Sequence, residues 1–388
     1  MFTQLHDRKD AGLRLATLLK AYAHRPDTLI LALPRGGVPV AFEISVALGL
    51  PLDILLVRKL GLITQPELAM GAIAMDGICV LNTELIHTLH IPTEAIDAVK
   101  IQEQHELQRR TLIYRGNKPL PNLNNKTVIL VDDGLATGAT MHAAIDAVKK
   151  HHARDIIVAI PVAPVDTYEK IRETVTSVFC LIKANNFGSV GEWYSLFPQT
   201  TDQEVCQLLR DADTHLAILK GAAILKAGGI VAVPTEAVFG LSCDPNQPDA
   251  VHRLSLLKKR SPAKKFILVA ATLEQCNPYL KGLTPSQSET LKNSWPGPVT
   301  WVIPLTNSDT IALRVTAHPI LRDLCLAFGG PLLSTSANIG GEPPCRDLAI
   351  LYAEWKNKID LIIPGELGLQ KNPTEIRSLL TGEILRDG

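Results

Sequence analysis

Short apolar runs alternate with amphipathic segments along the first half of the chain, a pattern typical of an α/β fold. The apolar runs are continuous rather than alternating, as expected for parallel strands that are buried on both faces. The pattern predicts strands at Thr28–Leu33, Asp53–Val57, Val128–Val131, Ile156–Val162 and Val175–Ala184. Helical spacing predicts helices at Ala11–Ala23, Val38–Leu48, Glu94–Tyr114 and Met141–Lys150. Asp76-Gly77, inside Met70–Leu81, predicts an antiparallel hairpin that forms a small flap.

The second half has shorter runs and more turn residues, which predicts a mixed sheet with helices around it. Strands are expected at Ile230–Val233, Phe266–Ala271, Val299–Pro304, Ile311–Val315, Pro331–Leu333, Leu361–Pro364, Thr374–Arg377 and Glu383–Arg386. Pro248–Lys259 reads as a helix.

The chain has 388 residues, too many for one ordinary core, so two domains are expected. Helical patterns at Thr201–Arg210 and His215–Ala227 are separated by the polar segment Asp211–Thr214, where we predict a break. The predicted domains are therefore residues 1–212 and 213–388.

Composition narrows the class of protein. The formal net charge is +0, so binding to a nucleic acid would need a local basic patch. The seven cysteines form no CxxC pair, which indicates reduced thiols and a cytoplasmic protein. No apolar run reaches the roughly 18 residues that a membrane span needs, and the first residues lack the apolar core of a signal peptide.

The segment with the most candidate functional residues is Val131–Thr140, VDDGLATGAT, between a predicted buried strand and a predicted helix. Small residues before a helix expose backbone N–H groups that can bind a phosphate, and threonine hydroxyls can add donors. The carboxylates of Asp132 and Asp133 suit sugar hydroxyls or a metal ion. The combination suggests a phosphorylated ribose, whereas the alternative is a pair of aspartates that only caps the helix.

A second loop of this kind is Pro34-Arg35-Gly36-Gly37, which follows the first strand. Parallel strands bring such loops to one edge of a sheet, so we expect this loop to face Asp132. An arginine beside two glycines suits a pyrophosphate, although a plain glycine turn is the alternative. Arg58 and Lys59 also follow a predicted strand, where they suit phosphate or simply solvent.

These motifs, together with RKLG at 58–61 and ELAMGAIA at 67–74, resemble the predicted phosphoribosyltransferases of the type I family over about residues 7–212. The resemblance implies a parallel sheet flanked by helices with a small hood, a phosphoribosyl pyrophosphate (PRPP) site, and displacement of pyrophosphate at the sugar C1 carbon. It places Arg35, Gly36 and Gly37 at the pyrophosphate and Lys59 near a flexible loop. Asp132 and Asp133 would hold the ribose with Mg²⁺, and Gly134, Ala136, Thr137, Gly138 and Thr140 would wrap the 5′-phosphate. No motif identifies the acceptor base. The alternative is therefore a domain that only binds or senses PRPP.

The second half carries its own candidate chemistry. Basic residues gather after the predicted helix at Lys258, Lys259, Arg260, Lys264 and Lys265, which suits a polyphosphate or RNA, or a solvated face. Arg314 lies among apolar neighbours and needs an anionic partner if it faces inward. Ser334, Thr335, Ser336 and Asn338 form a donor-rich segment after a strand, and Thr235 ends another strand.

From about residue 215 to 388 these segments resemble the TsaC/YrdC family of threonylcarbamoyl-AMP synthases. The resemblance rests on VPTEAVFGLSCDP at 233–245, LKKRSPAKKFIL at 257–268, WPGPVTWVIP at 295–304, ALRVTAHP at 312–319, STSAN at 334–338, and the C-terminal PTEIR and ILRDG. The resemblance implies a twisted mixed α/β sheet. It also implies synthesis of L-threonylcarbamoyladenylate and pyrophosphate from L-threonine, bicarbonate and ATP with Mg²⁺.

The family reaction suggests roles for these residues. Lys258, Arg260 and Lys264 are the expected catalytic cations, and Thr235, Arg314, Ser334, Thr335, Ser336 and Asn338 are expected to bind threonine and ATP. The product would pass to other proteins that modify tRNA, so contact with tRNA is optional for this chain. The alternative is an RNA-binding module of the same fold, with the first half as a PRPP-sensing regulator. The sequence does not indicate an oligomeric state.

Overall fold

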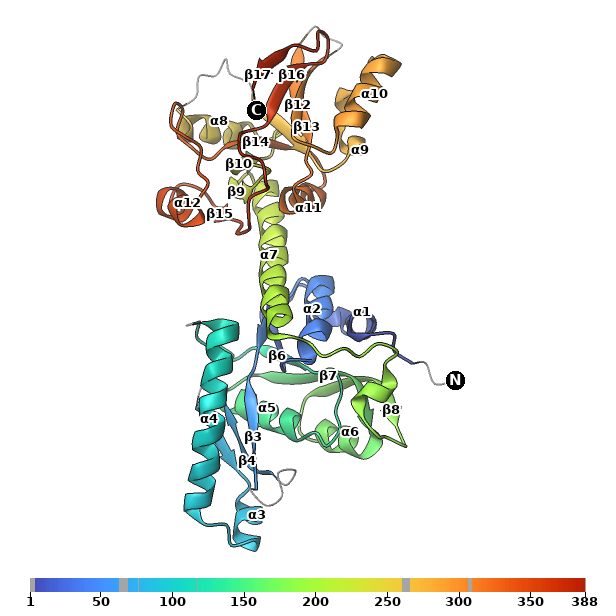
Figure 1. Ribbon diagram of the computed structural model, residues 1–388, viewed down its shortest axis with the longest axis vertical. Helices are drawn as coiled ribbons and strands as arrows, with labels where there is room; N and C mark the ends of the chain where they lie inside the picture. Colours follow the sequence, from blue (N-terminus) through green and yellow to red (C-terminus); the bar gives the residue numbers. More distant parts are fainter. Residues whose placement is uncertain are drawn as a thin grey trace. The chain divides into compact units, whose positions relative to one another are not determined.

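The computed structural model describes residues 4–62, 69–75, 77–116, 118–259, 266–305 and 309–387. They divide into two compact units, Met1–Leu216 (the N-terminal unit) and Ala217–Gly388 (the C-terminal unit), each with sheets and helices of its own (Figure 1). Within the described residues, no helix is both long enough and apolar enough to cross a membrane.

The main sheet of the N-terminal unit is parallel, with the strand order β2-β1-β6-β7-β8. The strands are β1 (Thr28–Ala32), β2 (Leu52–Ile54), β6 (Thr127–Val131), β7 (Asp155–Pro164) and β8 (Ser177–Ala184). Strands β1 and β6 are buried at every residue, which is why their sequences are continuous apolar runs. The predicted parallel sheet is confirmed.

Helices cover both faces of this sheet, as in a doubly wound fold (Figure 1). The helices are α1 (Arg8–Leu18), α2 (Gly37–Leu48), α5 (Ala139–Lys150) and α6 (Val165–Arg172). Helices α1 and α2 pack with Ile30 and Ile129 in one core. Helices α5 and α6 pack in the other core, on the opposite side chains of the same strands. Helix α1 begins at Arg8, because the Asp7 side chain accepts a hydrogen bond from the Asp10 backbone N–H and caps it.

A small antiparallel sheet with strand order β3-β4-β5 forms the expected hood. It contains β3 (Val57–Gly61), β4 (Ala69–Ala74) and β5 (Cys79–Leu81), followed by α3 (Thr83–Thr88) and α4 (Thr93–Arg115). The single strand predicted at Asp53–Val57 is wrong, because the chain passes from β2 to β3 through the buried Leu55 and Leu56. Lys59 therefore lies within a strand of the hood, and Asp76 of the predicted turn lies outside the described residues.

The C-terminal unit contains one mixed sheet with the order β15-β9-β10-β14-β11-β13-β12-β16-β17, in agreement with the predicted mixed fold. The strands are β9 (Val231–Pro234), β10 (Phe239–Cys243), β11 (Ile267–Ala270), β12 (Val299–Pro304), β13 (Thr310–Val315), β14 (Leu332–Ser336), β15 (Leu361–Ile362), β16 (Glu375–Ser378) and β17 (Ile384–Arg386). Strand β10 was not predicted, because Gly240 and Ser242 interrupt its apolar pattern. It pairs with both β9 and β14.

Helices also cover both faces of this sheet. They are α8 (Pro248–Leu257), α9 (Leu273–Cys276), α10 (Pro285–Ser294), α11 (Pro319–Phe328) and α12 (Leu348–Trp355). Residues of α8, α10 and α12 share one core, whereas α11 and the last turns of the preceding helix, α7, share the other.

Helix α7 (Asp202–Lys226) is one continuous helix, and the predicted break at Asp211–Thr214 is wrong. That segment contains neither glycine nor proline, so nothing in its backbone ends a helix. Asp211 and Asp213 are exposed and Ala212 is buried, so the polar segment is simply one exposed face. The boundary between the two units, at Leu216, falls within this helix.

Candidate functional sites

In the N-terminal unit, the loops after β1 and β6 lie against each other. The two strands are parallel neighbours, with Ala32 opposite Val131, and the Leu33 N–H donates to the Val131 carbonyl at 2.8 Å. An added Cβ at Gly36 would lie 1.9 Å from Asp133 Oδ2, and one at Gly37 would lie 2.6 Å from the Val131 oxygen. The expectation that the two loops face each other is therefore confirmed, and both glycines are needed for the close approach.

The acidic pair is half-buried at this edge of the sheet. Asp132 Oδ1 accepts a hydrogen bond from the Asp133 backbone N–H at 2.9 Å, and the Tyr194 hydroxyl donates to the Asp133 carbonyl at 2.6 Å. Burial raises the pKa of both carboxyls, and the negative charge of Asp133 raises the pKa of Asp132 further. Such a pair is stabilised by a cation or by hydroxyl donors. Among the described residues no group of three or more acidic, His or Cys side chains could hold a metal alone.

Arg8 also lies at the acidic pair, although the sequence gives no indication of this contact. Its Nε and Nη2 donate to Asp133 Oδ2 at 2.9 and 2.8 Å, and its Nη1 donates to the Pro198 carbonyl at 2.6 Å. The guanidinium lies 3.9 Å above the centre of the Phe197 ring. A depression of about 510 Å³ is lined by Arg8, Arg35, Gly36, Asp133, Val190, Phe197, Pro198, Gln199 and Thr200. Arg8 and Asp133 are 125 positions apart, so no local pattern could have paired them.

Arg35 extends from this loop toward the beginning of α7. Its Nη1 lies 3.5 Å from Asp202 Oδ1, and the Tyr114 hydroxyl donates to the same oxygen at 2.5 Å. Arg35 thus has an internal anion as its partner in this structure. In the predicted phosphate loop, Gly138 adopts φ +74° directly before α5, and the side chains of Thr137 and Thr140 are exposed. The Ala136 carbonyl in this loop accepts from the Thr167 hydroxyl at 3.0 Å.

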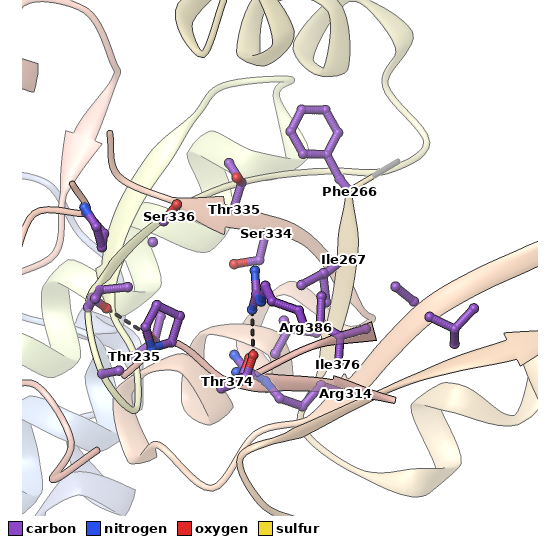
Figure 2. Close-up of a pocket in the computed structure, with 18 residues that line it drawn as sticks. Thr235, Phe266, Ile267, Arg314, Ser334, Thr335, Ser336, Thr374, Ile376 and Arg386 are labelled. Carbon is purple, nitrogen blue, oxygen red and sulfur yellow. Dashed lines mark hydrogen bonds between the residues drawn. The ribbon is translucent and has the colours of Figure 1, made fainter. Parts of the chain in front are cut away.

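The C-terminal unit contains a cavity of about 330 Å³ (Figure 2). It is lined by Thr235, Ala237, Val238, Gly240, Phe266, Ile267, Val269, Val302, Ala312, Arg314, Ser334, Thr335, Ser336, Pro344, Pro373, Thr374, Ile376 and Arg386. Five of the predicted binding residues, Thr235, Arg314 and the segment 334–336, therefore meet at one cavity. Arg260 and Lys264, two of the predicted catalytic cations, lie outside the described residues.

Lys258 and Asn338 organise the hydroxyl-rich segment. The buried Lys258 ammonium donates to the Ser336 carbonyl at 2.6 Å, the Asn338 carbonyl at 2.5 Å and Asn338 Oδ1 at 2.8 Å. The Ser336 hydroxyl also donates to Asn338 Oδ1, at 2.6 Å. These contacts join the end of α8 to the loop after β14, so Lys258 fixes the position of that loop.

The buried cation of the cavity is paired with a carboxylate, Glu236, that is not among the predicted site residues. Arg314 Nη2 lies 3.2 Å from Glu236 Oε2. Burial raises the pKa of Glu236, but the Arg314 charge and the Thr316 hydroxyl outweigh burial, so the pKa lies below its ordinary value. Arg386 also lines the cavity, and its Nη2 donates to the Thr374 carbonyl at 2.5 Å (Figure 2). In the sequence, Glu236 belongs to the family-like segment at 233–245, and Arg386 belongs to the C-terminal ILRDG. These segments were the signals that could have indicated the two residues.

Comparison with known proteins assigns a family to each half. A model described as a phosphoribosyl transferase domain matches residues 2–195, and the Sua5/YciO/YrdC model, described as telomere recombination, matches residues 223–388. A Coxiella burnetii protein named threonylcarbamoyl-AMP synthase is 48% identical over 171 residues, which are 42% of this chain and 92% of that protein.

Relatives of the first half are also known. A Mycobacterium tuberculosis protein named "Putative phosphoribosyl transferase" is 42% identical over 211 residues, covering 54% of this chain and 47% of that protein. The chain thus spans about half the length of this relative. The solved structure of TT1426 from Thermus thermophilus is 34% identical, with a TM-score of 0.49, covering 53% of this chain and 98% of that one. The chain belongs to the phosphoribosyl transferase domain family in its first half and to the Sua5/YrdC family of threonylcarbamoyl-AMP synthases in its second.

Proposed function

We propose that the C-terminal unit makes L-threonylcarbamoyladenylate and pyrophosphate from L-threonine, bicarbonate and ATP. The observation that carries the proposal is the cavity, which combines a buried guanidinium, Arg314, with the hydroxyl-rich segment 334–336. A cation suits the carboxylate of an amino acid, and hydroxyl donors suit the phosphate of a nucleotide. The name of the Coxiella burnetii relative supports the same reaction.

The described side chains divide between the two substrates. Arg314 takes the α-carboxylate of threonine, and the Thr235 hydroxyl, just after β9, lines the same cavity. Ser334 and Thr335 donate to the adenylate phosphate, while Ser336, Asn338 and Lys258 hold their loop in place. No side chain has to form a covalent intermediate, because catalysis rests on alignment and on charge.

The amine nitrogen of threonine bonds to the carbon of bicarbonate and water leaves, which gives the threonine carbamate. The step that follows is a displacement at phosphorus. An oxygen of the threonine carbamate bonds to the α-phosphorus of ATP, the bond from that phosphorus to the α,β-bridging oxygen breaks, and pyrophosphate leaves with the electron pair. Arg260 and Lys264 neutralise the growing charge on pyrophosphate, whereas Lys258, whose three N–H donors go to Ser336 and Asn338, acts through the loop that it holds. Mg²⁺ would share the charge when it is bound to ATP.

Threonine-dependent release of pyrophosphate tests this proposal. We expect the purified chain to release pyrophosphate when ATP, bicarbonate and L-threonine are all present, and not when threonine is left out. Ser336→Ala should lower the rate, whereas Ser286→Ala, on the exposed start of α10, should not. Salt-sensitive RNA binding without turnover would instead support an RNA-binding module.

We propose that the N-terminal unit binds PRPP and transfers its phosphoribosyl group to an acceptor. The carboxylates of Asp132 and Asp133 would take the ribose hydroxyls with Mg²⁺, and the loop at residues 134–140 would take the 5′-phosphate. Arg35 and the adjoining glycines would take the pyrophosphate, which leaves as an acceptor nitrogen bonds to the C1 carbon. The support is the contact between the two loops and the family match.

Calorimetric titration with PRPP and Mg²⁺ tests this second proposal. We expect binding by the natural chain and by Asp166→Asn, which changes an exposed carboxylate at the start of α6. Asp133→Asn should abolish measurable binding. Retained binding by Asp133→Asn would show that the acidic pair does not hold the sugar. If PRPP binds and changes the synthase rate while no base accepts ribose phosphate, the unit is a sensor instead.

A further inference from the structure

Further contacts hold the buried Arg314–Glu236 ion pair at the cavity of the C-terminal unit. Arg314 and Glu236 expose only 5% and 6% of their surfaces, so each charge needs the other. The backbone of Arg314 is fixed in β13, where it pairs with Val269 of β11. The aliphatic stem can still rotate, so the direction of its guanidinium depends on where the Glu236 carboxylate is held.

Several contacts hold that carboxylate. Glu236 Oε1 accepts from the Thr316 hydroxyl at 2.6 Å and from the Ala317 backbone N–H at 3.3 Å. The Glu236 carbonyl accepts from the Gln370 N–H at 3.0 Å, and Gly368 packs so closely that a Cβ there would lie 2.6 Å from the Glu236 oxygen. The Thr316 hydroxyl oxygen in turn accepts from the His318 N–H at 3.1 Å. Glu236 is thereby fixed from both its backbone and its carboxylate.

One edge of the arginine has no hydrogen-bond partner among the described residues. Arg314 Nη2 faces Glu236, while Arg314 Nε is buried without a hydrogen-bond partner among the residues that the structure describes. Arg314 also lines the cavity, among the side chains drawn in Figure 2. A buried N–H donor without a partner is costly, and a ligand oxygen in the cavity would satisfy it.

We propose that Glu236, held by Thr316, is a positioning residue that aims the Arg314 guanidinium at the α-carboxylate of L-threonine. This inference rests on the proposed synthase function. It assigns the Glu236 carboxylate to recognition of the amino acid. Glu236 acts through Arg314 and does not contact the reacting phosphate. The proposed adenylate contacts come from Ser334 and Thr335 on another strand, so a disturbed Glu236 should affect threonine and leave ATP binding unchanged.

The experiment measures separate KM values for L-threonine and ATP in the full chain. Thr316→Val removes the hydroxyl that holds Glu236 but keeps the ion pair, so the chain should fold. We expect its KM for threonine to rise about tenfold, with a KM for ATP within about twofold of the natural value. Thr316→Ser restores a hydroxyl and should bring the KM for threonine back down. Glu236→Gln should raise the KM for threonine at least as much.

The controls separate this inference from loss of structure and from failure of the proposed function. Arg322→Gln breaks the exposed Arg322–Asp323 ion pair in the same unit and should change neither KM. A Thr316→Val chain with less active protein but unchanged KM values would make Thr316 merely structural and overturn the inference. Equal changes in both KM values would also overturn it. A natural chain without threonine-dependent turnover would instead refute the proposed function.

Discussion

Gly36 shows how a single residue limits the geometry of the proposed PRPP site. Its backbone dihedrals, φ −62° and ψ −31°, suit any amino acid, so the glycine is not needed for its conformational freedom. The obstacle to a side chain is Asp133, whose Oδ2 would lie 1.9 Å from an added Cβ. We expect Gly36→Ala to lower the free energy of unfolding by about 2 kcal/mol and to abolish PRPP binding, because the acidic pair must move. Denaturant unfolding and calorimetry measure the two effects.

A double-mutant cycle supplies the control for this prediction. In an Asp133→Ala background, where the clashing oxygens are gone, Gly36→Ala should cost clearly less stability. Gly330→Ala, whose nearest added contact would be 3.8 Å away in the C-terminal unit, should cost little. An equal cost of Gly36→Ala in both backgrounds would mean that Asp133 is not the obstacle.

His318 gives the C-terminal unit a pH dependence of known sign. Burial lowers the pKa of this histidine below its ordinary value of 6.5, and its Nε2 lies 3.1 Å from the Glu366 carbonyl. The unfolded chain therefore binds the proton more readily than the folded chain, and stability falls as the pH falls below about 6.5. The effect is at most about 1.4 kcal/mol per pH unit.

Denaturant unfolding from about pH 8 to about pH 5.5 checks this prediction. His318→Gln, which can still donate to the Glu366 carbonyl, should lose less stability over that range than the natural chain. Parallel pH profiles for the two chains would show that His318 does not titrate differently on folding.

At the scale of elements, helix α7 connects the N-terminal site with the start of the second unit. The Thr201 hydroxyl accepts from the Glu204 N–H at 3.1 Å and caps the helix, so the Asp202 carboxylate is not needed as the cap. The Tyr114 hydrogen bond is the largest effect that lowers the pKa of Asp202, and the Arg35 charge lowers it further. Asp202 thus stands as an anion beside the arginine that is proposed to bind pyrophosphate.

We expect Asp202→Asn to raise the affinity for pyrophosphate about two- to fivefold, because a half-exposed ion pair no longer competes for Arg35. Calorimetric titration with pyrophosphate and Mg²⁺ measures the change. Asp211→Asn makes the same charge change further along α7 and should leave the affinity as it was. Unchanged or weaker binding by Asp202→Asn would contradict the competition, as would an equal gain in Asp211→Asn.

The elements that the sequence predicts well are those with local signals. The run Val128–Val131 is apolar throughout because β6 is buried on both faces, and the small residues after it begin α5. The sequence does not predict strand β10, because its glycine and serine interrupt the apolar pattern, and it predicts a break in α7, because exposed polar residues there resemble a loop. In both sites, the side chains that support the site residues also escape prediction. Arg8 reaches Asp133, and Thr316 reaches Glu236, only through tertiary structure.

At the scale of the whole molecule, each unit has its own core and its own site, so ligands should stabilise them separately. PRPP with Mg²⁺ should raise the unfolding temperature of the N-terminal unit, and ATP with L-threonine that of the C-terminal unit. Asp133→Asn should remove only the PRPP effect. Differential scanning calorimetry measures both shifts, and a loss of both in Asp133→Asn would contradict independent sites.

The most direct test of the central claim is to detect the product itself. Incubation of the full chain with ATP, L-threonine and ¹³C-labelled bicarbonate, followed by mass spectrometry, should reveal threonylcarbamoyladenylate carrying the label, with an equal amount of pyrophosphate. Omission of threonine should abolish both products, and Arg314→Met should lower both together. Unlabelled adenylate, or pyrophosphate released equally without threonine, would contradict the assignment of the C-terminal unit as a threonylcarbamoyl-AMP synthase.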